Sequence, residues 1–110
     1  AYQQWYAAQA APAPEPTVAE AAAGKAVFLN KPCAACHTVR GTPATGTSGP
    51  DLTHVASRRT IGAGLLETTR GSLAAWIADP QTLKPGNNMP LVPLTSDELR
   101  QISAYMEDLR

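Results

Sequence analysis

The chain has 110 residues, a formal net charge of zero and 44% hydrophobic residues. This length predicts one domain, and the zero net charge argues against nucleic acid or a strongly anionic membrane surface as a partner. No stretch reaches the roughly 20 apolar residues that a membrane span needs. Only six residues are aromatic, so the core is poor in large rings.

The first 16 residues differ in composition from the rest of the chain. Residues 1–9 carry three aromatic side chains, and residues 10–16 have proline at every second position from Pro12 to Pro16, with alanine at most of the other positions. Such alternation favours an extended polyproline II spacer, and a short spacer usually joins two folded parts. We therefore expect residues 1–16 to be the tail of an upstream domain with an Ala/Pro linker, and residues 17–110 to be the domain itself. A start at Ala1 rather than Met indicates a processed product or a piece of a longer chain.

The first helix of the domain is expected over residues 17–30. Thr17 and Glu20 have the spacing of a capping box, and Pro32 follows the expected end. Further along, the composition favours a turn of helix over 33–38, a loop over 38–49, a helical turn over 52–56, an irregular segment over 60–64, a helix over 72–78 and an ordered loop over 83–94.

The last helix, from Thr95 to the end, has the clearest signals. Thr95 and Glu98 form a second capping box. Apolar residues at helical spacing predict one buried stripe, made of Leu99, Ile102, Met106 and Leu109. No run alternates with a period of two, so we predict an all-α fold of three main helices plus short turns.

The segment Cys33-Ala34-Ala35-Cys36-His37 carries the chemistry. This is the spacing of c-type haem attachment. Two thiols three positions apart can reach the two vinyl groups on one edge of a porphyrin, and the adjacent imidazole can bind the iron. We therefore predict one haem c bound covalently through Cys33 and Cys36, with His37 as an iron ligand. Attachment of this kind takes place on the outer side of an energy-conserving membrane.

Three other interpretations of the cysteines are weaker. A structural zinc site needs four ligands, and the adjacent residues Cys36 and His37 fit a tetrahedral site badly even if His54 is counted. A dithiol redox pair needs a βαβ context, which the sequence lacks. A disulfide framework would need more than two cysteines.

The second iron ligand has three candidates. Met89 lies in a loop with prolines on both sides, where a side chain can point its sulfur at a metal. Met106 lies on the apolar stripe of the last helix, where methionine usually fills the core. His54 is close in sequence to His37, which is a short span for a chain that must cross to the other haem face. We therefore predict His37 and Met89 as the metal ligands.

From residue 17 to 110, the chain resembles class I monohaem cytochromes c. Gly24 and Phe28 match the Gly/aromatic pair of that family's first helix, and Ile102 and Tyr105 match the contact residues of its last helix, which crosses the first at right angles. The resemblance implies the class I cytochrome c fold around one covalent haem.

The resemblance also implies further haem-binding residues. The segment that contains Pro50 and Leu52 looks like the one whose proline carbonyl accepts the ring N–H of the iron-bound histidine. Trp76, with Arg58 or Arg59, matches positions that hydrogen-bond a haem propionate.

Three segments, 57–60, 73–80 and 84–90, are similar to the cytochrome c domain of subunit II of caa(3)-type cytochrome c oxidase, and Trp5 looks like the tail of the preceding copper domain. This resemblance implies an electron-entry domain that does not itself catalyse a reaction. It would take an electron from a respiratory donor protein and pass it to a binuclear copper centre of the same polypeptide, beside the oxidase membrane subunits. The location implied is periplasmic, or the outer face of the cytoplasmic membrane.

Two alternatives remain. One is a free-standing periplasmic cytochrome c that shuttles between complexes. The other is a haem enzyme or ligand sensor, which would need an open sixth position and is disfavoured by Met89.

Overall fold

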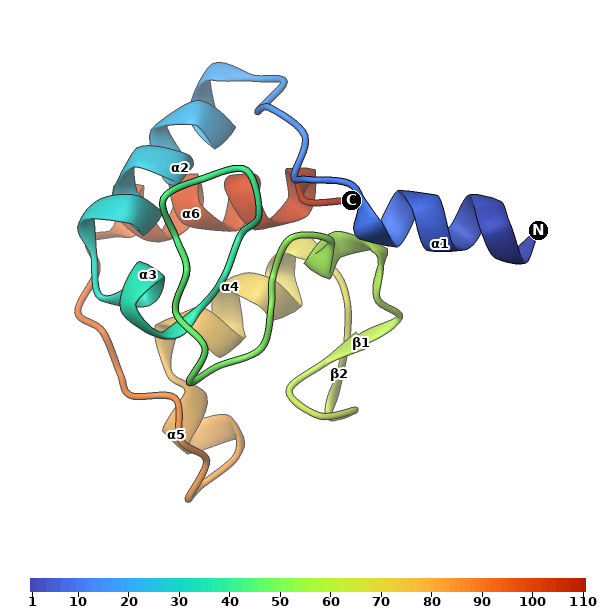
Figure 1. The fold of residues 1–110 in the computed structure, drawn as a ribbon. Helices are drawn as coiled ribbons and strands as arrows, with labels where there is room; N and C mark the ends of the chain where they lie inside the picture. The colour runs from blue at the N-terminus through green and yellow to red at the C-terminus, as the bar shows by residue number, and fades with distance from the viewer.

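Helices make up nearly all of the regular secondary structure in this computed structural model, which describes residues 1–110 (Figure 1). The elements in chain order are α1 (Tyr2–Ala10), α2 (Ala19–Asn30), α3 (Cys33–Cys36), the short 3-10 helix η1 (Val55–Ser57), β1 (Thr60–Ile61), β2 (Leu66–Glu67), α4 (Arg70–Ala78), α5 (Pro80–Leu83) and α6 (Ser96–Asp108). The prediction of an all-α fold is confirmed. None of these helices combines the length and the hydrophobicity that a membrane-spanning helix needs.

The α2–α6 crossing is the centre of the fold, and α4 packs on α6 as well. At this crossing Gly24 lies so close to α6 that an added Cβ would be 1.9 Å from the Gln101 carbonyl oxygen and 2.9 Å from the Tyr105 Cβ. Only glycine allows two helix backbones to approach this closely. Gly24, which matches the glycine of the family's first helix, thus lies at the contact between α2 and α6.

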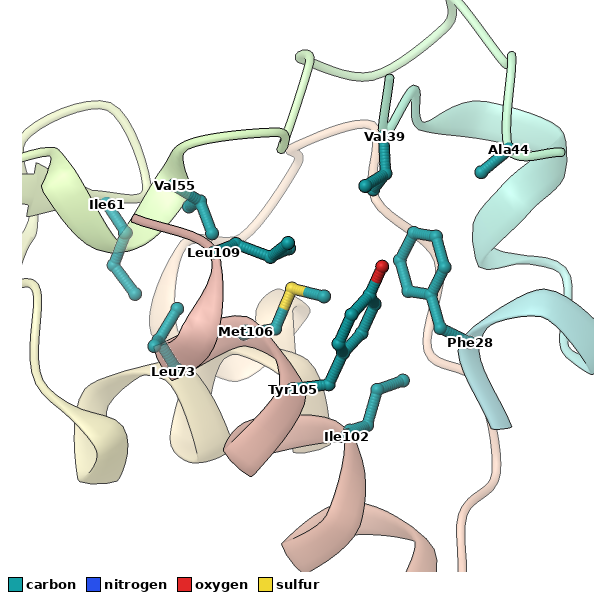
Figure 2. Close-up of a cluster of buried hydrophobic side chains, with 10 residues drawn as sticks. All are labelled: Phe28, Val39, Ala44, Val55, Ile61, Leu73, Ile102, Tyr105, Met106 and Leu109. Carbon is teal, nitrogen blue, oxygen red and sulfur yellow. The ribbon is translucent and has the colours of Figure 1, made fainter. Parts of the chain in front are cut away.

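The hydrophobic core is formed around α6 by ten buried side chains from several elements (Figure 2). Phe28 of α2 meets Tyr105 of α6 edge to face, with ring centroids 5.9 Å apart. Burial raises the pKa of Tyr105 to about 12. Met106 is 3% exposed and lies among these side chains, as the helical spacing predicted.

The two predicted capping boxes have different outcomes. The box at α6 is confirmed, because Thr95 Oγ1 accepts from the Glu98 backbone N–H while the Glu98 carboxylate accepts from the Thr95 backbone N–H. The prediction of a capping box at α2 is wrong, because this helix begins at Ala19 without a side-chain cap. The backbone N–H and the hydroxyl of Thr17 donate instead to Asp108, at 2.9 and 3.0 Å.

Glu20 forms an ion-pair network that links three helices. Its carboxylate pairs with Arg70 of α4, and with Arg100 of α6 at 3.0 Å. The hydrogen bond from Arg70 is the main reason that the pKa of Glu20 is lowered. These tertiary partners take the place of the local cap that the sequence predicted.

The segment between η1 and α5 differs from the prediction in three places. Residues 60–67 form a small antiparallel hairpin, with Thr60 opposite Glu67. α4 starts at Arg70 because the Thr69 hydroxyl accepts from the Ser72 backbone N–H. α4 ends at Ala78 as predicted, but Asp79 then caps α5, a short helix that was not predicted and that begins with proline at its first position. Strands of two residues are too short to show an alternating pattern, so the sequence could not indicate them.

Helix α1 was not predicted. It has no buried residue, and it extends from the rest of the domain near the C-terminus (Figure 1). Its side chains Tyr2, Trp5 and Tyr6 are exposed and lie close together. The ring centroid of Tyr2 is 6.2 Å from that of Trp5 and 6.3 Å from that of Tyr6.

Candidate haem site

The two cysteines lie on α3, a single turn of helix. Cys33 and Cys36 are free and half-buried, and a separation of three positions places them on the same helix face. Burial raises the pKa of the Cys33 thiol. His37 ends the helix: its backbone N–H donates to the Cys33 carbonyl at 2.9 Å, and the chain then becomes extended. The structure thus brings the two thiols and the imidazole together within one turn.

The His37 ring is oriented by a single hydrogen bond. Its Nδ1 lies 2.8 Å from the Pro50 carbonyl oxygen. A carbonyl can only accept, so Nδ1 donates its proton, and in the neutral ring Nε2 then has the lone pair that a metal binds. This is the contact that the resemblance implied for Pro50, and such a partner orients the ring and raises its basicity.

Two glycines let the loop after His37 fold back onto α3. A Cβ on Gly49 would lie 2.6 Å from the His37 Cε1, and one on Gly46 would lie 2.4 Å from the Ala35 carbonyl group. The Gly46 and Gly49 N–H groups donate to the His37 and Cys36 carbonyls, at 3.2 and 2.6 Å. A side chain at either glycine would push the loop away from the motif. The Gly-rich composition of residues 38–49 was the signal for this approach, but it did not identify Gly46.

The competing interpretations of the motif gain no support. No group of three or more His, Cys, Asp or Glu side chains is placed to hold a metal ion, which argues against the zinc site. Both ring nitrogens of His54 are engaged away from His37: Nδ1 is 2.6 Å from the Arg110 carbonyl oxygen and Nε2 is 2.7 Å from that of Ala11.

Met89 lies in a loop that follows α5, and its side chain is half-buried. Its backbone N–H donates to the Asn87 Oδ1 at 2.7 Å, and its carbonyl accepts from the Gln81 amide at 2.9 Å. The same amide nitrogen donates to the Asn87 carbonyl at 2.8 Å, and the Gln81 Oε1 accepts from the Gly86 N–H at 3.2 Å. Gln81 therefore holds the whole loop in one conformation.

Gln81 is a residue that the sequence analysis missed. A glutamine near two prolines gives no local signal for such contacts, since they depend on how the loop returns to α5. Met106, the competing candidate, lies instead in the packed core on α6.

Leu52, Arg58 and Arg59, three further predicted haem-binding residues, differ in exposure and in their polar contacts. Leu52 is half-buried against the core, and its N–H donates to the Thr38 carbonyl at 2.8 Å. Arg58 donates to the Asp51 carbonyl, one residue from Pro50. Arg59 is exposed, and no polar contact of its side chain is present.

Trp76 of α4 packs under the hairpin. Its ring would lie 3.0 Å from a Cβ on Gly62, which has a φ of +63°. Near it in the chain, the Thr68 hydroxyl is buried without a hydrogen-bond partner.

The donor set fits a covalently attached haem. It offers two thiols on one helix face, an imidazole whose Nε2 is free to bind iron, and a thioether on a loop held by hydrogen bonds. Imidazole and thioether are the ligand pair that suits an electron-transfer haem.

Comparison with known proteins agrees with this geometry. The family model for Cytochrome c matches residues 21–110. The chain is 40% identical, over 99% of its length, to the protein named cytochrome c oxidase subunit 2 of Alkalihalophilus pseudofirmus, and it covers 31% of that protein. It is 35% identical over 79% of its length to the protein of the same name from Bacillus sp. (strain PS3), of which it covers 25%. It is also 32% identical to cytochrome c-551 of Stutzerimonas stutzeri, with 79% of this chain and 77% of that protein covered.

Proposed function

The chain belongs to the cytochrome c family, and we propose that it is the electron-entry domain of a haem-copper oxidase, joined through residues 1–16 to an upstream copper domain. Haem-based electron transfer and the class I cytochrome c fold follow from the family itself. The similarity to cytochrome c oxidase subunit 2 supports the finer proposal. That match covers 99% of this chain, so it includes α1 and the Ala/Pro segment, which lie outside the family match.

The chain spans about a third of the length of that relative. We therefore propose three partners: a respiratory donor protein, a binuclear copper domain of the same polypeptide, and the membrane subunits of the oxidase. The location proposed is the periplasmic side, or the outer face of the cytoplasmic membrane, with attachment through the parent subunit.

The protein's own residues would hold the cofactor in a fixed geometry. Cys33 and Cys36 would anchor it through two thioethers, and the bond to Pro50 keeps the His37 ring in one orientation. A bound haem supplies a one-electron couple between ferric and ferrous iron. Leu52 and Trp76 would line the apolar side of the site, with an arginine, Arg58 or Arg59, beside a propionate.

Met89 would be the second metal ligand. A soft thioether favours ferrous iron and raises the reduction potential, and a filled sixth position disfavours oxygen chemistry at the iron. The hydrogen bonds from Gln81 to the Asn87 and Met89 carbonyls support this role, because they would hold the loop that presents the sulfur. No acid, base or nucleophile is needed, because an electron is the only species transferred.

A free-standing periplasmic cytochrome c is the second candidate. The similarity to cytochrome c-551 favours it, because this chain covers 77% of that small protein. The copper domain decides between the two: a gene product with copper ligands upstream of residue 1 supports the electron-entry domain.

The observation that carries the proposal is the match of the whole chain, α1 included, to an oxidase subunit. The test is to purify the 110-residue chain and the intact parent protein. Mass spectrometry should show one covalent haem on each. The isolated chain should accept an electron but reduce oxygen only slowly, whereas the parent complex should consume oxygen rapidly. Rapid oxygen consumption by the isolated chain would refute the proposal.

A further inference from the structure

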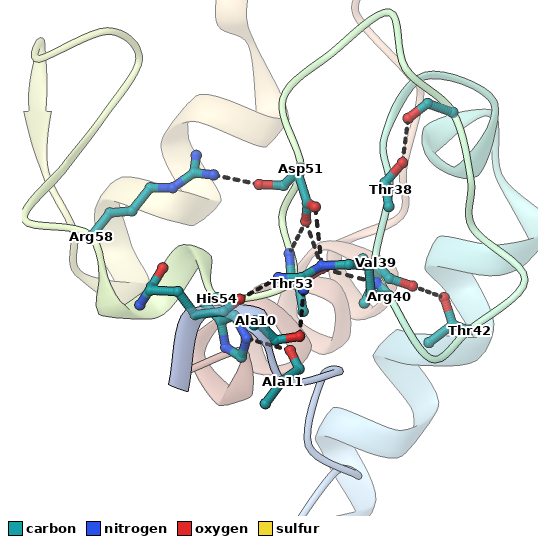
Figure 3. Close-up of polar contacts among 12 residues, drawn as sticks. Ala10, Ala11, Thr38, Val39, Arg40, Thr42, Asp51, Thr53, His54 and Arg58 are labelled. Carbon is teal, nitrogen blue, oxygen red and sulfur yellow. Dashed lines mark hydrogen bonds and ion pairs between the residues drawn. The ribbon is translucent and has the colours of Figure 1, made fainter. Parts of the chain in front are cut away.

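Residues 9–13, the last turn of α1 and the residues that follow it, are hydrogen-bonded to the surface of the haem domain, and Figure 3 shows the contacts of Ala10 and Ala11. The Arg40 guanidinium donates to the Ala10 carbonyl at 2.7 Å and to the Gln9 carbonyl at 2.5 Å. These are terminal carbonyls of α1, which have no partner within the helix. A cation at this end also interacts favourably with the helix dipole.

A second side chain and the backbone complete the attachment. His54 Nε2 lies 2.7 Å from the Ala11 carbonyl oxygen, and the Ala13 N–H donates to the Arg40 carbonyl at 2.8 Å. The other ring nitrogen of His54 faces the Arg110 carbonyl at 2.6 Å, so this histidine joins the connecting segment to the end of the chain. A neutral ring can donate to only one of the two carbonyls, and a protonated ring can donate to both.

The arginine is itself held by the domain. Its Nε lies 3.3 Å from the Asp51 carboxylate. Burial raises the pKa of Asp51, but hydrogen bonds from Thr53 and the nearby Arg40 charge lower it more. Pro12 packs beside Gly41, where an added Cβ would be 3.1 Å from the proline ring and φ is +91°. Further along, the two bonds from Thr17 to Asp108 tie down the start of α2.

We propose that residues 9–13 form a docked strap rather than a free spacer, and that Arg40 and His54 are positioning residues that hold α1 in one orientation on the haem domain. Four residues of the strap are hydrogen-bonded to residues 27 to 43 positions away in the sequence, which a freely moving polyproline spacer would not show. Given the proposed function, the strap fixes how the haem domain faces the upstream copper domain.

The experiment on the strap needs only this chain with its haem. Backbone NMR order parameters of Gln9, Ala10, Ala11 and Ala13 should be about 0.85, as in rigid helices. In an Arg40→Ala/His54→Ala double variant they should fall below about 0.6, while those of α6 stay unchanged. The matched control is Arg70→Ala, because Arg70 also bonds a carboxylate and a carbonyl, but these belong to Glu20 and Arg100 and not to the strap. Flexible strap amides in the unmodified chain, or equal loosening in the control, would overturn the proposal.

The positioning role is then measured in the intact parent protein. After flash reduction of the haem, electron transfer to the copper centre should follow a single exponential. In the double variant it should become slower and lose its single-exponential form, and in Arg70→Ala it should not. Unchanged kinetics in the double variant would refute the positioning role. Absence of any copper reduction in the unmodified protein would refute the proposed function instead, and would leave the strap result standing.

Discussion

Replacement of Gly24 by alanine should destabilise the fold, although alanine is the better helix former. The gain in helix propensity is about 1 kcal/mol. The new Cβ would lie 1.9 Å from the Gln101 carbonyl oxygen and 2.5 Å from its carbon, whereas such atoms normally stay about 3.3 Å apart or more. Both atoms belong to the α6 backbone, so no side-chain rotation can relieve the clash and the helices must separate.

Overpacking of this kind costs about 3 kcal/mol at the upper end of its usual range. After the propensity gain, the net loss is about 2 kcal/mol, or a fall in Tm of about 8–16 °C for a domain of this size. The assay is thermal unfolding of the haem-loaded chain by circular dichroism.

The control for Gly24→Ala is Gly71→Ala, since Gly71 also lies in a helix but has no contact closer than 4.0 Å to an added Cβ. This variant should be neutral or slightly stabilised. If Gly24→Ala melts at or above the temperature of the unmodified chain, the close crossing of α2 and α6 is refuted.

Three further predictions concern ligation and pH. Met89→Ala should abolish the methionine-to-iron absorption band and lower the potential, while Met106→Leu should keep the band and cost less than about 1.5 kcal/mol; the opposite pattern would reverse the assignment. Gln81→Leu removes the hydrogen bonds that hold the Met89 loop, so the methionine-to-iron band should weaken and titrate away at lower pH. An unchanged band would show that the loop keeps its conformation without the Gln81 side chain. Stability should fall as the pH drops below the ordinary glutamate value of 4.5, because an arginine N–H at Glu20 and a helix-cap N–H at Glu98 lower both pKa values. This stabilisation is complete above that pH and is lost as the pH falls through the lowered values; a Glu98→Gln variant that is just as acid-sensitive would contradict this reasoning.

Features that depend on a few neighbouring residues could be read from the sequence. The spacing of Cys33, Cys36 and His37 specifies two thiols and an imidazole on one helical turn, and the structure has that turn. The cap of α6 and its buried stripe were also predictable, because capping and helical periodicity act within a few residues. The same applies to the assignment of Met106 to the core.

Features that depend on contacts between distant segments were decided by the tertiary structure. Thr17 and Glu20 have the local pattern of a cap, yet each bonds to residues of distant helices: Thr17 to Asp108, and Glu20 to Arg70 and Arg100. The hydrogen bonds of Gln81 to the Met89 loop could not be predicted from the sequence, because its partners come together only when the loop folds back onto α5.

The Ala/Pro segment shows the difference most clearly. Its composition predicts an extended spacer, and residues 11–16 do contain no helix. Whether such a spacer moves freely or lies on the domain depends on Arg40 and His54, which are remote in sequence and near in space. Composition determines what conformation a short segment can adopt, whereas its place on the surface depends on the distant donors that satisfy its carbonyl groups.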